Sequence, residues 1–144
     1  EKLAALNAFV AARFDAPTGS ALPITPRETL ERGSRYSGPL ALAMATLAHA
    51  GGYDVRIVDL RAGDAVHSIV EVFYEGKWHV YDPAYGVSVT NEAGRVASHV
   101  ELSQSPALVA RMGHGAAARP GWRADLVPEL FGSGVHHYRV FADR

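Results

Sequence analysis

The chain has 144 residues, of which 48% are hydrophobic and 20% are charged, and this composition is typical of a globular protein with one hydrophobic core. The formal net charge of −1 and the lack of a basic stretch argue against nucleic acid as a partner. The most apolar stretch, residues 40–48, is far shorter than the ~20 residues that a membrane-spanning helix needs.

We therefore expect a single domain over residues 1–144 that works in the cytoplasm and does not contact a membrane. The sequence contains no cysteine, which excludes disulfide bonds and thiolate zinc sites. Its first residue is Glu1 rather than methionine, so we expect that the chain was trimmed or is part of a larger protein.

The first third of the chain is predicted to be helical. Apolar spacing and helix-end residues indicate helices at residues 2–14, 25–33 and 38–50. Thr25 can cap the second helix and Gly33 can end it, while Gly51 and Gly52 can end the third. Residues 15–26 between the first two helices read as a turn-rich connector.

The rest of the chain favours strands, with shorter helical pieces. Strands are predicted at residues 54–60, on both sides of a tight turn in 65–86, and at 136–142. We expect a turn at 91–95, a short helix at 105–112, a flexible loop at 113–121, and a helical or irregular piece at 124–132. Helices followed by an antiparallel sheet indicate the α+β class.

The predicted hairpin places a histidine beside an aspartate. With Glu75 and Gly76 at the centre of the turn, Ile69 lies opposite Asp82. Strand alternation puts His67 on the face of Ile69, so His67 is a diagonal neighbour of Asp82. Such neighbours are ~7–8 Å apart, within reach of an imidazole and a carboxylate.

This pair has a chemical meaning, because a carboxylate bonded to one imidazole nitrogen leaves the other nitrogen to act as a base. Ser37 precedes the predicted helix at 38–50, where backbone N–H groups and the helix dipole stabilise a developing anion. Each residue also has a plain structural interpretation. Ser37 can be an ordinary N-cap, His67 a structural strand residue, and Asp82 part of a turn.

Taken together, two stretches resemble the transglutaminase-like superfamily, which has a papain-like Cys-His-Asp site. The first stretch is "SGPLALAMATLAHAGGYDVRIV" and the second is "HSIVEVFYEGKWHVYDPAYG". The resemblance covers about residues 25–90 and puts His67 and Asp82 on the family's histidine and aspartate. It implies an α+β, papain-like fold in which N-terminal helices, including the nucleophile helix, pack on an antiparallel β-sheet.

Ser37 occupies the position of the family's catalytic cysteine. Three explanations remain open: an engineered replacement of cysteine by serine, a natural serine nucleophile, or a domain that has lost catalysis. We favour the first because the rest of the constellation is intact. A serine hydroxyl is hardly ionised at neutral pH, so we expect this chain to be inactive or slow.

The resemblance implies acyl transfer or hydrolysis on an amide, peptide or tethered thioester substrate through a covalent acyl intermediate. Ser37, His67 and Asp82 are the predicted catalytic residues, and the backbone N–H of residue 37 is a predicted oxyanion donor. No metal or cofactor is expected. The alternatives are a non-catalytic binding domain that keeps the fold and a natural Ser-His-Asp hydrolase.

Other residues of the hairpin invite comparison with these three. Glu71 faces the same side as His67 and is expected to be structural or to pair with Arg56. Phe73 and Trp78 oppose each other and are expected in the core. Tyr85 can line the cleft or be an aromatic residue of the turn.

Three histidines elsewhere carry weaker signals. His136 and His137 are adjacent strand residues that point to opposite faces, so we do not expect them to chelate one metal ion. His114 lies between two glycines and is expected in a mobile loop that can act as a lid.

Overall fold

We describe residues 1–14, 25–117, 124–132 and 136–140 from a computed structural model of the chain. The N-terminal part forms helices α1 (Lys2–Ala11), α2 (Pro26–Arg32) and α3 (Ser37–Ala50). The predicted connector 15–26 lies largely outside the described residues. The three helices confirm the predicted ones, although α1 ends before residue 14.

Local chemistry explains the ends of α2. The Thr25 hydroxyl accepts the Glu28 backbone N–H, and the Glu28 carboxylate accepts the Thr25 N–H, so the two residues form a capping box. Gly33 follows the helix with φ of 76°, a left-handed conformation that favours glycine. The capping and stop signals of the sequence are therefore confirmed.

Four antiparallel strands form one sheet in the order β3-β2-β1-β4. They are β1 (Asp54–Ala62), β2 (Ala65–Tyr74), β3 (Lys77–Tyr81) and β4 (His136–Val140). Glu75 and Gly76 form the β2–β3 turn with φ of 50° and 76°, as a two-residue hairpin requires. The last pair of this hairpin is Val70 with Tyr81, so the predicted register is confirmed.

Each face of the sheet carries its own hydrophobic cluster. The first cluster contains α3 residues and the β1 and β2 side chains Val55, Ile57, Val70 and Val72. The second contains the β1 and β2 side chains Val58, Leu60 and Ile69, together with residues of the C-terminal helices. This split follows from the alternation of strand side chains between the two faces.

The second face is covered by a helical layer that the sequence indicated only in part. It consists of α4 (His99–Gln104), α5 (Pro106–Ala117), the 3₁₀ turn η1 (Ala124–Leu126) and α6 (Val127–Gly132). α4 was not predicted, although Ser98 and Glu101 form a capping box at its start. That spacing of serine and glutamate is the sequence signal for a helix start.

The predicted loop at 113–121 is wrong for its first half, because α5 continues to Ala117 and includes His114. Close packing explains one glycine of this helix, Gly115. A Cβ on Gly115 would lie 2.6 Å from a Val87 methyl carbon, so a side chain there would push α5 away from the loop after β3. Residues 118–121 lie outside the described part of the chain.

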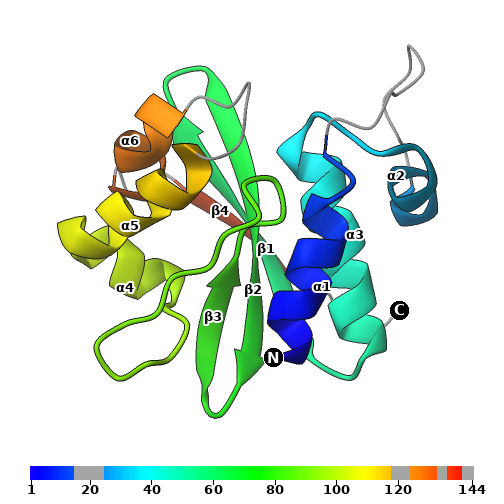
Figure 1. The fold of residues 1–144 in the computed structure, drawn as a ribbon, viewed down its shortest axis with the longest axis horizontal. Coiled ribbons are helices and arrows are strands. Elements are labelled where there is room, and N and C mark those ends of the chain that lie inside the picture. The colour runs from blue at the N-terminus through cyan, green and yellow to red at the C-terminus, as the bar shows by residue number, and fades with distance from the viewer. Residues whose placement is uncertain (15–24, 118–123, 133–135, 141–144) are drawn as a thin grey trace.

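Figure 1 shows α1–α3 on one side of the sheet and α4–α6 on the other. The structure therefore confirms the α+β class, with α3 packed on β1 and β2. Within the described ranges, no helix combines the length and apolar character needed to cross a bilayer.

Candidate functional site

His67 and Asp82 form a short hydrogen bond inside the protein. His67 Nε2 lies 2.6 Å from Asp82 Oδ2, and the exposed fractions of the two residues are 2% and 0%. A carboxylate can only accept hydrogen bonds, so Nε2 carries the proton and the neutral ring has its lone pair on Nδ1. The predicted contact between these side chains is therefore present.

The turn after β3 holds the Asp82 carboxylate in place. Asp82 Oδ1 accepts the backbone N–H groups of Ala84 and Tyr85, at 3.1 and 2.9 Å. The turn is closed by a bond from Gly86 N–H to the Asp82 carbonyl, at 2.7 Å. Both carboxylate oxygens are thus engaged, and this leaves Oδ2 directed at the imidazole.

Ser37 is the first residue of α3 and not its N-cap. The N-cap is Tyr36, whose side chain makes no capping bond. The Ser37 hydroxyl instead accepts the backbone N–H of Ser68 in β2, at 3.0 Å. This long-range contact contradicts the interpretation of Ser37 as an ordinary cap, because the hydroxyl is used between two elements rather than within the helix.

The contact places Ser37 at the edge of β2, next to His67. Strand N–H groups lie in the plane of the sheet, and β3 has ended before the level of Ser68, since its last pair is Val70 with Tyr81. Although α3 covers the face opposite to His67, its first residue therefore reaches the sheet edge rather than the far face. The N–H that Ser37 accepts belongs to the peptide group that joins His67 to Ser68, so the hydroxyl lies close to the His67 backbone.

The three residues differ in depth. The exposed fraction falls from 6% at Ser37 to 2% at His67 and 0% at Asp82. The side chain at position 37 is therefore the outermost of the three, and the carboxylate is the innermost. Tyr36, beside Ser37, is 61% exposed, so the surface of the protein begins directly at the start of α3.

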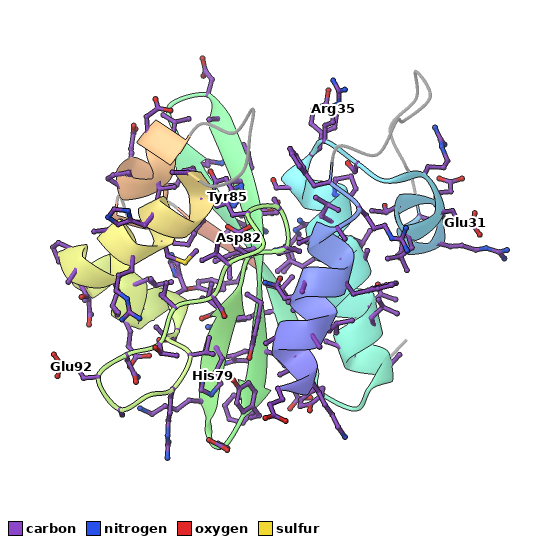
Figure 2. All side chains as sticks on the ribbon, in the orientation of Figure 1. Glu31, Arg35, His79, Asp82, Tyr85 and Glu92 are labelled. Atoms are coloured by element: carbon purple, nitrogen blue, oxygen red, sulfur yellow. The ribbon has the colours of Figure 1, made fainter. Side chains whose placement is uncertain are left out.

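Tyr85 covers the imidazole. Its ring is stacked on that of His67 with centroids 4.4 Å apart and an interplanar angle of 20°. Burial raises the pKa of the Tyr85 phenol well above its usual range, and the Asp82 charge adds to this shift. The phenol is therefore neutral at physiological pH. Figure 2 shows Asp82 and Tyr85 near the centre of the molecule, with His79 toward the hairpin end of the sheet.

Besides the His67–Asp82 bond, a series of polar contacts leads from Ser37 through Ser68 and Asp59 to Arg139. Ser68, whose N–H bonds Ser37, donates its own hydroxyl to Asp59 at 2.6 Å. Asp59 is in turn paired with Arg139 at 2.8 Å. The sequence analysis did not single out Ser68, and its position directly after His67 in a strand was the only signal for it.

The contacts of Glu71, Phe73 and Trp78 show which of the remaining predictions for the hairpin are correct. Arg56 Nη2 lies 2.6 Å from Glu71 Oε2, which confirms the predicted pair. Phe73 and Trp78 face each other with ring centroids 5.2 Å apart, but Phe73 is 37% exposed. Neither ring belongs to a hydrophobic core cluster, so their prediction as core residues is wrong, and Trp78 instead packs against the Arg56 guanidinium.

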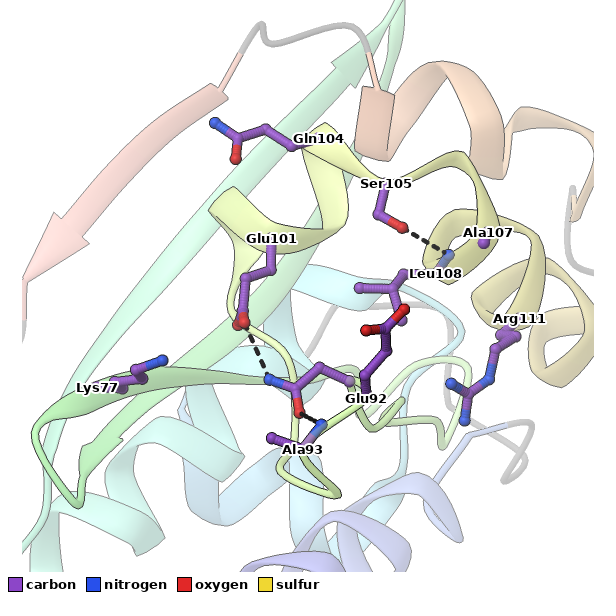
Figure 3. A pocket seen from close by; sticks show the side chains of 10 residues that line it. Lys77, Glu92, Ala93, Glu101, Gln104, Ser105, Ala107, Leu108 and Arg111 are labelled. Atoms are coloured by element: carbon purple, nitrogen blue, oxygen red, sulfur yellow. Dashed lines mark hydrogen bonds between the residues drawn. The ribbon is translucent and has the colours of Figure 1, made fainter.

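A cavity of about 630 Å³ lies elsewhere, at the junction of α4, α5 and the loop at 91–93. Figure 3 shows its polar lining, in which Glu101 accepts the Asn91 amide. The guanidinium of Arg111 donates to the Thr90 carbonyl at 2.6 Å. These groups serve to hold the loop against the helices, and none of the three predicted catalytic residues lines this cavity.

The described residues contain no group of three or more potential metal ligands. His136 and His137 are consecutive residues of β4.

The chain matches no protein-family model, no curated protein and no solved structure. The assignment of a function therefore depends on the geometry of Ser37, His67 and Asp82 and on the resemblance of the two sequence stretches.

Proposed function

We propose that this chain is a transglutaminase-like acyl-transfer domain whose site consists of position 37, His67 and Asp82. The observation that carries the proposal is the buried 2.6 Å bond between His67 Nε2 and Asp82 Oδ2, next to the start of α3. The histidine, the aspartate, the chain order and the spacing also resemble the family's pattern, whereas serine replaces the family's cysteine at position 37. The papain-like form of this fold, with residue 37 as nucleophile, is part of the same proposal.

The proposed reaction uses the lone pair on His67 Nδ1. His67 takes the proton from the side chain at position 37, whose sulfur or oxygen attacks the carbonyl carbon of an amide or thioester. As the bond to the leaving group breaks, His67 returns the proton to that group, which leaves an acyl group on position 37. Water or an amine then attacks the acyl carbon and releases the product.

Asp82 orients the imidazole and stabilises it when it is protonated. Its rigid environment supports this role, because Ala84 and Tyr85 hold Oδ1 while Oδ2 faces the ring. The backbone N–H of residue 37 is the proposed oxyanion donor, since the N–H groups of the first helical turn have no partner within the helix.

The Ser68 N–H adds an argument for a nucleophile at this position. It donates to the side-chain oxygen of Ser37, so it would stabilise negative charge on a thiolate there. Together with the start of α3, this donor lowers the pKa expected of a thiol at position 37. A serine gains far less, because its hydroxyl starts from a much higher pKa.

The decisive experiment is Ser37→Cys, with Ala93→Cys as the matched control at an exposed turn. Because the sequence contains no cysteine, each variant carries a single thiol. An ordinary thiol, with a pKa of about 8.5, is about 0.3% ionised at pH 6. We expect iodoacetamide to alkylate Ser37→Cys about 10–100-fold faster than Ala93→Cys at this pH, and His67→Gln to remove most of the difference.

Acyl transfer itself is tested with an activated acyl thioester, by mass spectrometry of the intact protein. We expect an acyl adduct at position 37 in the Ser37→Cys variant. Equal alkylation of the two thiols, with or without His67, would contradict the proposal and identify a binding domain. Acylation of Ser37 in the unchanged chain would instead identify a Ser-His-Asp hydrolase.

A further inference from the structure

The face of the His67 imidazole is covered by one aromatic residue. The Tyr85 ring lies nearly parallel to it, with centroids 4.4 Å apart and planes inclined by 20°. Phe131 of α6 contacts the same imidazole at a centroid distance of 6.4 Å, inclined by 58°. The three residues are at most 4% exposed, so the stack is part of the interior and holds the plane of the imidazole.

Tyr85 also contacts the partner of that imidazole. Its backbone N–H donates to Asp82 Oδ1 at 2.9 Å, while Asp82 Oδ2 accepts from His67 at 2.6 Å. The same residue therefore holds the carboxylate through its main chain and the imidazole through its side chain. Its place three residues after Asp82 in a closed turn couples the two contacts.

We propose that Tyr85 is a positioning residue of the site, whose ring keeps His67 Nε2 on Asp82 and directs Nδ1 toward position 37. This inference rests on the proposed function. In this role Tyr85 acts through its contacts with His67 and Asp82. Because an electron-rich aromatic face attracts a cation, the stack also favours the imidazolium that forms during the reaction.

The chemistry of the phenol is consistent with this role. Burial and the charges of Asp82 and Asp125 raise the pKa of Tyr85, so its ring stays neutral over the working range of pH. Asp82, the neutral Tyr85 and the apolar Phe131 are among the described groups that face the imidazole. Since the stack uses the ring and not the hydroxyl, phenylalanine can replace tyrosine, whereas an aliphatic side chain cannot.

The first test measures His67 in the unchanged Ser37 chain, by NMR of the imidazole nitrogens. We expect the Nε2-protonated tautomer in the parent and in Tyr85→Phe, and a mixture of tautomers in Tyr85→Leu. Leu102→Ala is the matched control, because Leu102 is a buried residue of the same hydrophobic cluster. It is expected to lower stability and leave the tautomer unchanged.

The second test measures the pH profile of alkylation in the Ser37→Cys background. We expect the alkylation rate of Tyr85→Phe at pH 6 to stay within about twofold of the rate of its parent. We expect Tyr85→Leu to be alkylated about tenfold more slowly at pH 6, with the midpoint of its rate–pH curve at a higher pH. If Tyr85→Leu does not fold, Tyr85→Met takes its place.

A parent-like tautomer and profile in Tyr85→Leu, or an equal change in Leu102→Ala, would overturn the inference. If the thiol at position 37 is ordinary, the proposed function fails, but the tautomer of His67 still decides the role of Tyr85.

Discussion

Two hydrogen-bonded acid–base pairs lie on the same face of β2, only four residues apart, and they differ in the chemistry of the basic partner. Glu71 pairs with Arg56 of the neighbouring strand β1. His67 pairs with Asp82, which follows β3. Both acids are completely buried, so burial alone does not tell a structural pair from a chemical one.

The Arg56–Glu71 pair is enclosed by its neighbours. The guanidinium lies between the rings of Trp78 and Tyr138, at 4.1 and 4.3 Å from their centroids. The second carboxylate oxygen of Glu71 accepts the backbone N–H of His99 at 2.7 Å. This pair joins β1, β2, β4 and the start of α4, and arginine has no proton that it can release at physiological pH.

The His67–Asp82 pair contains an imidazole instead of a guanidinium, and an imidazole can serve as a general base. Like the guanidinium, it is covered by aromatic rings, those of Tyr85 and Phe131, but its neighbour at the edge of β2 is the first residue of α3. Under the proposed function, the two pairs therefore differ in that the imidazole can take up and return a proton beside position 37, whereas the guanidinium cannot. The following predictions test this contrast.

The largest expected effect comes from Asp82→Asn in the Ser37→Cys background. Ala84 and Tyr85 donate to Oδ1, so an asparagine keeps its carbonyl there and turns its NH₂ group toward His67 Nε2. That donor favours the tautomer with its proton on Nδ1, which is the wrong one for a base. We expect acyl transfer to fall by about 10²–10⁴-fold, with the fold retained.

Enzyme kinetics measure the rate, and NMR of the imidazole nitrogens measures the tautomer. Full activity in Asp82→Asn would reduce Asp82 to a turn residue and remove the contrast between the two pairs.

The second effect is on stability. Glu71→Gln leaves the Arg56 charge buried without its partner, which costs about 3–5 kcal/mol, as measured by urea unfolding. The control is Glu31→Gln, which breaks the exposed Arg27–Glu31 pair and is expected to change stability very little. In the folded double variant Glu71→Gln with Ser37→Cys, the alkylation rate of the thiol should equal the rate in Ser37→Cys alone. A selective loss of reactivity would make Glu71 part of the site.

The smallest effect concerns the start of α4, which supplies the His99 N–H to Glu71. The Ser98 backbone N–H lowers the pKa of the Glu101 carboxyl below its ordinary 4.5, and the Asn91 amide adds to this effect. A carboxyl whose pKa is lower in the folded state stabilises the protein above its unfolded pKa, and this stabilisation is lost as the pH falls. The stability advantage over Glu101→Gln should therefore be complete at neutral pH, begin to fall near pH 4.5, and be lost only as the pH drops through the lowered pKa of the folded state.

Glutamine keeps the capping geometry, so this comparison isolates the charge. Thermal unfolding of both proteins from pH 3 to 7 measures how much the Glu101 charge contributes to stability. A difference between the two proteins that is the same at every pH would assign the effect to packing.

Much of the fold followed from local patterns. The capping box at Thr25, the turn at Glu75 and Gly76 and the alternation of the hairpin each involve residues close in sequence, so they were correctly predicted. α4 was missed despite its capping box, because it is only one and a half turns long. The helical continuation of α5 through Gly115 could not be predicted, since Val87 selects glycine there through a tertiary contact.

The sequence by itself determined the His67–Asp82 pair, because a two-residue turn fixes the register and strand periodicity fixes the face. Only the tertiary structure decided where Ser37 lies. Its hydroxyl meets the Ser68 N–H across 31 positions of the chain, at the point where β3 ends and leaves the edge of β2 available. It also decided that Tyr85 stacks on His67, because the turn that places this ring depends on hydrogen bonds from four backbone N–H groups to Asp82 and on the packing of α6.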